Sequence, residues 1–185
     1  MSIASHSTAH WNPSAANRAQ FAQSFGASLD IEPGTSAQAV VRDADVVLCA
    51  TRSRDESPVL QGHWLSAGTT VVSLGSTLPE QREVDVETMA RAACIVADMP
   101  KEVAEDTGDA IAAQQAGVPV TEKLVSLADL VAQRIAPRRA SDDIVLYKSV
   151  GSALQDVVLA EMLLARAKSR GIGIELPAFI HPVAK

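Results

Sequence analysis

Cysteines and long apolar runs are scarce in this sequence of 185 residues. The two cysteines, Cys49 and Cys94, lie in short apolar runs, and neither has a CxxC partner or an adjacent basic residue that would activate a thiol. We interpret both as reduced core residues, which excludes a small disulfide-stapled domain. No stretch approaches the roughly 18 apolar residues of a membrane span, and residues 1–10 do not resemble a signal peptide. We therefore expect a cytoplasmic protein with no membrane partner.

A surplus of positive charge is also missing, because 16 Lys and Arg residues stand against 22 Asp and Glu residues. The resulting net charge of -6 leads us to expect no nucleic-acid partner. It carries no argument against a nucleotide cofactor, since local backbone amides rather than overall charge hold such ligands.

Clusters of metal ligands are absent from the sequence as well. The four histidines are scattered without ligand spacing, and no histidine stands near the acidic pairs Glu83/Asp85 and Asp142/Asp143. Helix capping is a simpler role for these acids. We predict no metal site.

Apolar residues make up 47% of the chain, which is enough for a single core. Four short runs are rich in β-branched residues and do not alternate polar with apolar positions, so we predict strands that are buried on both faces. These runs are 45–50, 70–74, 94–97 and 144–147. Helical signals separate the runs, and this order predicts an α/β fold with an open parallel sheet and flanking helices.

Helices are predicted where a capping residue precedes an apolar period. Ser14 begins a helix with Phe21, Ala22 and Phe25 on one side, and we expect Gly26 to end it in the left-handed conformation. Two further capped segments are Asp85 with 86–93 and Ser126 with 127–135.

The longest predicted helix covers residues 152–169, with Gly171 at its end. Its middle is apolar almost all the way round, whereas a helix on the surface of a small domain normally has a polar face. We therefore expect residues 152–171 to pack on a missing domain or on a partner subunit, which makes a homodimer one expected assembly.

Four stretches, taken in their order and spacing, carry a resemblance. They are WNPS at 11–14, ADVVLCAT at 44–51, LGSTLPEQREVD at 74–85 and YKSVGSALQD at 147–156. From Trp11 onward the sequence resembles the ornithine cyclodeaminase/mu-crystallin family, which includes cyclodeaminases, some alanine dehydrogenases and ketimine reductases. The resemblance implies a Rossmann-like sheet and NAD or NADP as cofactor.

The resemblance also makes one absence informative. The family's dinucleotide fold opens with a strand and a glycine-rich turn whose amides hold the pyrophosphate. The ten glycines here contain no G-x-G-x-x-G, and the close pair Gly171 and Gly173 follows a helix instead of a strand. We expect residues 1–185 to form a partial NAD(P)-binding domain that lacks this strand and turn, and that lacks the family's N-terminal substrate-binding and dimer-forming domain.

Ligands of such folds lie at the carboxyl ends of the strands, which selects the candidate site. The expected cofactor-binding residues are Asn12, Ser14, Thr51, Gly75, Ser76, Thr77 and Val150. By resemblance, Asn12 and Ser14 grip the adenosine ribose or its 2′-phosphate, and Pro13 replaces an arginine that often favours the 2′-phosphate. The alternative is a turn with a helix cap.

Other candidates keep two interpretations. Thr51 either faces the cofactor or caps the next turn. Gly75 either permits close approach to the nicotinamide or forms a turn with positive φ. Lys148 either meets a phosphate or substrate, or forms a surface salt bridge.

Thr77 is the expected catalytic position. By resemblance, it stands where cyclodeaminase-like members have an aspartate credited with proton transfer and the mu-crystallin-like branch has serine. A threonine hydroxyl is not an ionised acceptor near neutral pH, so it cannot replace that carboxylate as a base.

Threonine at position 77 favours an oxidoreductase that reduces a cyclic ketimine such as pyrroline-2-carboxylate. One alternative is an ornithine cyclodeaminase, which converts ornithine to proline and ammonia. Another is a non-enzymatic module that associates through the long helix. The expected partner of either enzyme is a small cyclic imino acid or an amino acid.

Overall fold

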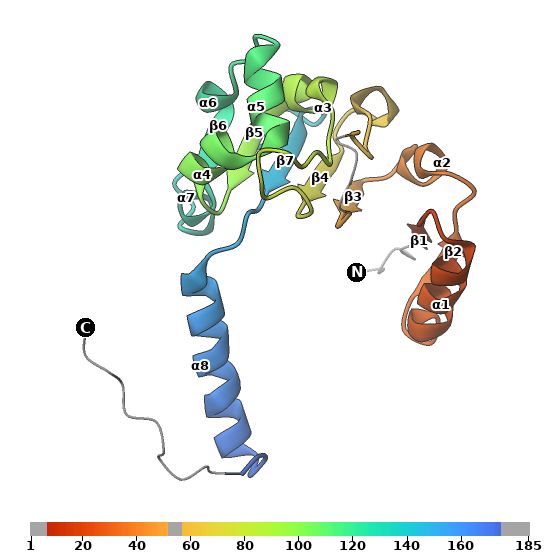
Figure 1. The fold of residues 1–185 in the computed structure, drawn as a ribbon, viewed down its shortest axis with the longest axis vertical. Coiled ribbons are helices and arrows are strands. Elements are labelled where there is room, and N and C mark those ends of the chain that lie inside the picture. Colours follow the sequence, from red (N-terminus) through yellow and green to blue (C-terminus); the bar gives the residue numbers. More distant parts are fainter. Residues whose placement is uncertain (1–6, 52–56, 175–185) are drawn as a thin grey trace. The chain divides into compact units, whose positions relative to one another are not determined.

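The computed structural model describes residues 7–51 and 57–174 and divides the chain into two compact units, Met1–Val150 and Gly151–Lys185. The first unit contains a five-stranded sheet in the order β3-β4-β7-β5-β6 and a two-stranded sheet, β1-β2 (Figure 1). All strand pairs are parallel. The strands are β1 Ser7–His10, β2 Asp30–Pro33, β3 Val46–Cys49, β4 Thr70–Ser73, β5 Ala92–Ala97, β6 Leu124–Ser126 and β7 Ile144–Lys148.

The predicted α/β class and the parallel sheet are therefore confirmed. All four predicted runs are strands of the larger sheet. Three strands lie outside the four predicted runs: β1 has the sequence STAH, β2 has the sequence DIEP, and β6 is three residues long. None of them offers the run of β-branched residues by which a buried strand is recognised.

Helices connect the strands as the parallel order requires. They are α1 Ala15–Phe25, α2 Ala37–Val41, the 3-10 turn η1 Gly62–Trp64, α3 Val86–Arg91, α4 Pro100–Asp106, α5 Gly108–Gln115, α6 Val120–Lys123, α7 Leu127–Val131 and α8 Ala153–Ser169. The predicted caps Ser14, Asp85 and Ser126 each accept a hydrogen bond from the first turn of their helix. Helices α3, α4, α6 and α7 contact β5.

Some helix ends differ from the prediction. Gly26 has φ -61°, a right-handed conformation, so the expected left-handed cap is wrong there. Helix α3 ends at Arg91 because β5 begins at Ala92. Helix α7 ends at Val131, and Gln133 then takes φ 56°, which stops the helix short of residue 135.

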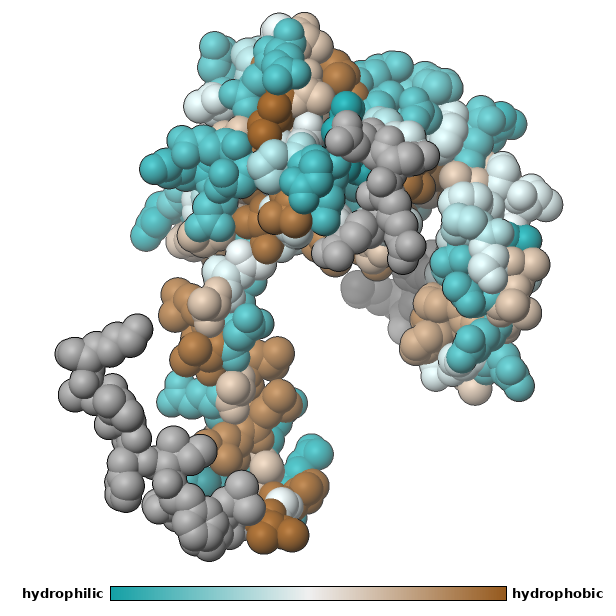
Figure 2. All heavy atoms as spheres, viewed as in Figure 1, coloured by the Kyte–Doolittle hydropathy of each residue, from teal (hydrophilic) through white to brown (hydrophobic). Residues whose placement is uncertain are grey.

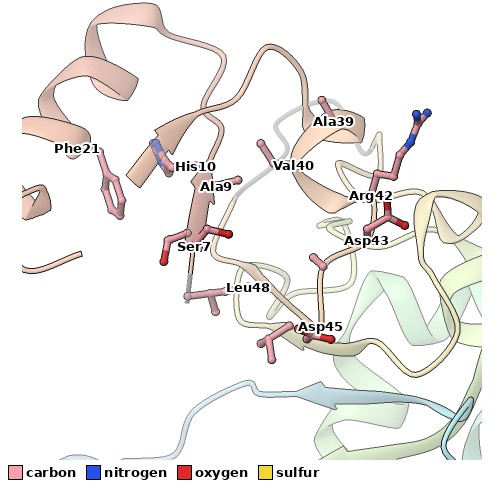
Figure 3. A pocket seen from close by; sticks show the side chains of 13 residues that line it. Ser7, Ala9, His10, Phe21, Ala39, Val40, Arg42, Asp43, Asp45 and Leu48 are labelled. Atoms are coloured by element: carbon pink, nitrogen blue, oxygen red, sulfur yellow. The ribbon is translucent and has the colours of Figure 1, made fainter. Parts of the chain in front are cut away.

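Burial on both faces was expected for the four predicted strands, and it holds for most of β5 and β7 only. In β3, Val47 and Cys49 are buried, whereas Val46 and Leu48 are 61% and 64% exposed. The alternation means that one face of β3, an edge strand of its sheet, is left uncovered. Val46 and Leu48 line a cleft of about 530 Å³, and β1 lines it from the other side (Figure 3).

The core lies between the sheet and the helices that follow it. Its fully buried members include Val71, Ile95 and Leu146 on central strands, with Met89 on α3. Burial of such side chains contributes about 1.5–3 kcal/mol each. This packing fixes the strand ends above which the candidate site is built.

The second unit contains α8, which Ser152 caps and which Gly171, with φ 62°, follows. No residue of this helix is buried, and Figure 2 shows hydrophobic side chains along its length. Within residues 7–51 and 57–174, no helix has the length and apolar character needed to cross a membrane.

Candidate functional site

The carboxyl ends of the five parallel strands are aligned in one row. Strand pairing places Cys49 beside Ser73, Ser73 beside Lys148, Lys148 beside Ala97, and Ala97 beside Ser126. The residues that follow this row therefore lie along one edge of the sheet. Thr51, Gly75 and Val150 are among them, as the sequence predicted.

Thr51 and Gly75 are joined by a carboxylate that the sequence analysis did not assign to the site. Glu83 Oε1 accepts hydrogen bonds from the Thr51 backbone N–H at 2.6 Å and from Thr51 Oγ1 at 3.0 Å. Glu83 Oε2 accepts from the Gly75 N–H at 2.9 Å and from Ser73 Oγ at 2.6 Å. The proton of the Thr51 hydroxyl is thus used within the protein, and its lone pairs are what it offers a ligand.

Glycine at position 75 is required by these neighbours. Its φ is not positive, so the interpretation as a positive-φ turn is wrong. A Cβ at this position would overlap the carbonyl oxygen of Thr51 and Oε1 of Glu83. The missing side chain therefore lets two strand ends and one carboxylate pack together.

Ser76 and Thr77 are both held by Gln81. Ser76 is buried and its Oγ donates to the Gln81 carbonyl oxygen at 2.6 Å, so its hydroxyl is used within the protein. The Thr77 N–H donates to Gln81 Oε1 at 3.1 Å, and Thr77 Oγ1 lies 3.4 Å from the same oxygen. Thr77 is partly exposed at the strand edge.

Val150 is fixed by an aspartate at the end of the neighbouring strand β5. Its N–H donates to Asp98 Oδ1 at 3.1 Å, and Ser149 Oγ donates to Asp98 Oδ2 at 2.7 Å. The chain after β7 is therefore tied to the chain after β5.

Asn12 and Ser14 follow β1, and their hydrogen bonds are local. Asn12 Oδ1 accepts from the Ser14 N–H at 2.9 Å, and Ser14 Oγ accepts from the Asn17 N–H at 3.3 Å, which makes the expected turn and helix cap. The Arg18 guanidinium donates to the carbonyl oxygens of Asn12 and Pro13. Arg18 therefore places a positive charge beside this turn, although Pro13 stands where the family often has an arginine.

Lys148 is not part of a surface salt bridge. It is fully buried, and its Nζ lies 2.7 Å from Asp109 Oδ2 and 2.9 Å from Ser73 Oγ. Asp109, in the first turn of α5, also accepts from the Glu83 N–H at 2.8 Å. We call Ser73, Glu83, Asp109 and Lys148 the strand-end ring.

The sequence pointed only in part to this ring. Glu83 was interpreted as a helix cap beside Asp85, and that role is correct for Asp85 alone. Asp109 lies in an unremarkable helical stretch whose only signal is an acid in a first turn. The ring also affects the neighbouring core residue Cys49. Burial, and then the negative charge of Glu83, raise the pKa of the Cys49 thiol to about 12.

Comparison with known proteins identifies the family of the chain. The model of the ornithine cyclodeaminase/mu-crystallin family matches residues 6–171. The chain belongs to this family. The sheet with flanking helices is the Rossmann-like fold of its structural neighbours.

Several members of the family are similar over most of the chain. The Delta(1)-pyrroline-2-carboxylate reductase of Colwellia psychrerythraea is 30% identical, over 78% of this chain and 43% of the relative. The structure of a probable ornithine cyclodeaminase from Bordetella pertussis Tohama I has a TM-score of 0.74 and 33% identity, covering 90% of this chain and 53% of the other.

A third similar protein is Thermococcus litoralis Delta(1)-pyrroline-2-carboxylate reductase, solved in complex with NADH and L-proline. It has a TM-score of 0.78 and 27% identity, covering 91% of this chain and 51% of the other. The chain spans about half the length of the curated relatives it matches.

Proposed function

We propose that this chain is the NAD(P)-binding part of an oxidoreductase. The observation that carries the proposal is the row of strand ends from Cys49 to Ser126, which aligns the backbone after β3, β4 and β7 at one edge. Ligands of open α/β sheets bind at such an edge. The Thermococcus litoralis structure, solved with NADH, supports the same assignment.

The residues present fit two ends of a dinucleotide. Thr51, Gly75, Thr77 and Val150, which are partly exposed, would hold the nicotinamide end, since they follow β3, β4 and β7. Ser76, which is buried, would support the loop between Gly75 and Thr77. The turn of Asn12 and Ser14, which follows β1, would hold the adenosine ribose. The sequence contains no G-x-G-x-x-G, so the fit covers these two ends and not the pyrophosphate.

The proposed reaction is hydride transfer at an edge that carries the neutral hydroxyl of Thr77 and no carboxylate at that position. A bound nicotinamide supplies or accepts the hydride, and the protein orients the reacting groups. Gln81 fixes the backbone and hydroxyl of Thr77, which therefore present a neutral hydrogen-bonding group at the edge. That group can orient an amide or a water, but it cannot remove a proton as a carboxylate does.

The substrate that best suits this edge is a cyclic ketimine such as pyrroline-2-carboxylate. Reduction of a ketimine needs a hydride and a proton donor, and it does not need a carboxylate base at position 77. The 30% identity to the Colwellia psychrerythraea reductase supports this substrate class.

Ornithine cyclodeamination is the second candidate, because the probable ornithine cyclodeaminase of Bordetella pertussis Tohama I is 33% identical. Thr77 counts against it, since deamination with ring closure requires a group that can accept a proton.

Incubation with each substrate separates the two activities. In a protein that joins this chain to a substrate-binding domain, we expect NADH and pyrroline-2-carboxylate to give NADH consumption and proline formation. This activity should be retained by Thr77→Ser and reduced about tenfold or more by Thr77→Val, which removes the hydroxyl. Formation of proline and ammonia from ornithine, without reduction of the ketimine, would overturn this substrate assignment.

A further inference from the structure

The strand-end ring is a closed circuit of buried hydrogen bonds beneath the candidate site. Ser73 Oγ donates to Glu83 and accepts from Lys148 Nζ, while Asp109 accepts from both Lys148 Nζ and the Glu83 backbone N–H. All four residues are fully buried. The circuit joins β4, β7, the first turn of α5 and the loop after β4.

The ring holds the site through one carboxylate. The N–H groups of Thr51 and Gly75, on loops after two different strands, both donate to Glu83. Lys148 is the last residue of β7 and leads directly into Ser149 and Val150. Three of the chain segments at the edge therefore take their positions from one set of directional bonds.

Charged groups are costly to bury, and apolar residues would fill the same space without that cost. Apolar contacts, however, do not specify where a backbone amide must lie, whereas a carboxylate with four donors around it does. The arrangement is also electrostatically balanced, because Arg82 Nε lies 3.8 Å from Asp109 Oδ1 and adds a second positive charge.

We propose that Glu83, Asp109 and Lys148 are positioning residues for cofactor binding. They do not contact the dinucleotide; they set the spacing of the loops that do. The inference rests on the proposed function. The N–H groups of Thr51 and Gly75 already donate to Glu83, so these two loops present hydrogen-bond acceptors to a ligand. Acceptors suit the NH2 group of a nicotinamide carboxamide better than they suit a phosphate.

Amide hydrogen exchange tests the positioning without any cofactor. Glu83→Gln keeps the side-chain size but places an NH2 group among the N–H donors of Thr51 and Gly75. We expect these two amides to exchange about tenfold faster or more, while the central-strand amides of Val71 and Leu146 keep their protection. Unchanged exchange at positions 51 and 75 would overturn the positioning role.

Titration with NADH tests the link to the cofactor. We expect Glu83→Gln to weaken NADH binding about tenfold or more, measured where the variant is folded, because small displacements of positioning groups have large effects. Met89→Ala is the matched control, since Met89 is fully buried on α3 and has no part in the ring. Equal weakening by both variants would show a merely structural role.

A single and a double variant test the ion pair of Lys148 and Asp109. Lys148→Met leaves Asp109 buried without its partner, whereas Lys148→Met combined with Asp109→Asn removes both charges and keeps an oxygen that can accept from the Glu83 N–H. We expect the double variant to recover protection at Thr51 and Gly75 relative to Lys148→Met. Failure to recover would contradict a role carried by hydrogen-bond geometry.

The outcomes separate the two proposals. If the unaltered chain does not bind NADH, the proposed function fails, and exchange at positions 51 and 75 still decides the positioning role. If Glu83→Gln does not fold, Ser73→Ala, which removes one bond of the ring, provides the same comparison. Faster exchange with unchanged NADH affinity would overturn the cofactor part of the inference.

Discussion

At the scale of single residues, Gly75 is tightly enclosed where the chain leaves β4. Its Cα faces the carbonyl oxygen of Thr51 and the carboxylate of Glu83, with no room for a side chain. A methyl group here must displace backbone, which a packed interior resists.

We therefore expect Gly75→Ala to lower the free energy of unfolding by roughly 3 kcal/mol. Gly117→Ala is the control, because a Cβ at Gly117 meets open space and only its φ of 84° is unfavourable, which costs about 1 kcal/mol. Urea unfolding of both variants measures the difference. Equal losses would mean that the loop relaxes around the added methyl group.

The two cysteines should differ in reactivity. Burial raises the pKa of the Cys49 thiol to about 12, and burial also raises the pKa of Cys94, which is only half-buried. At pH 8 the thiolate fraction of Cys49 is then about one in ten thousand. We expect iodoacetamide to label Cys94 first and Cys49 only after unfolding, as peptide mass spectrometry would show. Equally fast labelling of Cys49 would contradict its burial.

The contacts of single residues were the least predictable feature of the structure. Thr51, Gly75 and Val150 were selected correctly as strand-end positions, because ligands follow parallel strands. The buried partners were not predicted. Glu83 lies 32 residues from Thr51, and Asp109 lies 39 residues from Lys148, so these pairs depend on which loops the fold brings together. Glu83 is only eight residues from Gly75, but no local motif indicates that its carboxylate accepts from the Gly75 N–H.

At the scale of elements, helix α3 depends on one cap. Asp85 Oδ1 accepts from the Thr88 N–H and the Thr88 hydroxyl, each at 2.7 Å, and from the Gly62 N–H at 2.9 Å. One carboxylate thus begins α3 and also fastens η1 to it.

Asp85→Ala should lower the free energy of unfolding by about 2 kcal/mol, the upper end for a helix cap, because a backbone donor of η1 also loses its acceptor. Ser36→Ala is the comparison: Ser36 caps α2 with a single exposed bond of 3.1 Å to Ala39, and we expect a loss of about 0.5–1 kcal/mol. Thermal unfolding followed by circular dichroism measures both. A smaller effect at Asp85 than at Ser36 would contradict its double role.

Elements were predicted best where a cap or a β-branched run marked them. The caps at Ser14, Asp85 and Ser126 were correct because they depend on local backbone donors. Helix ends were less predictable, since tertiary pairing decided them: Ala92 joins β5 instead of continuing α3.

At the scale of the whole molecule, α8 presents an unusual surface. Val157, Leu159, Met162 and Leu163 are each more than half exposed on a helix with no buried residue. Apolar surface of this extent is typical of an interaction site. The expected association with another domain or a second copy remains a prediction.

If two copies associate through α8, sedimentation should show a dimer whose proportion rises with concentration. Replacing Leu159 and Leu163 together with lysine should weaken dimerisation about hundredfold or more, since each leucine would lose its burial. Gln155→Lys is the control on the same helix. A monomer at every concentration would rule out association between copies.

The central claim is that this chain carries a working half of a dinucleotide site. Titration with NADH, following nicotinamide fluorescence and thermal stability together, tests it most directly. We expect saturable binding and a stability gain that approaches about 2.7 kcal/mol at a hundred times the Kd. No fluorescence change and no stabilisation at about millimolar NADH, the upper range of ordinary enzyme affinities, would contradict it.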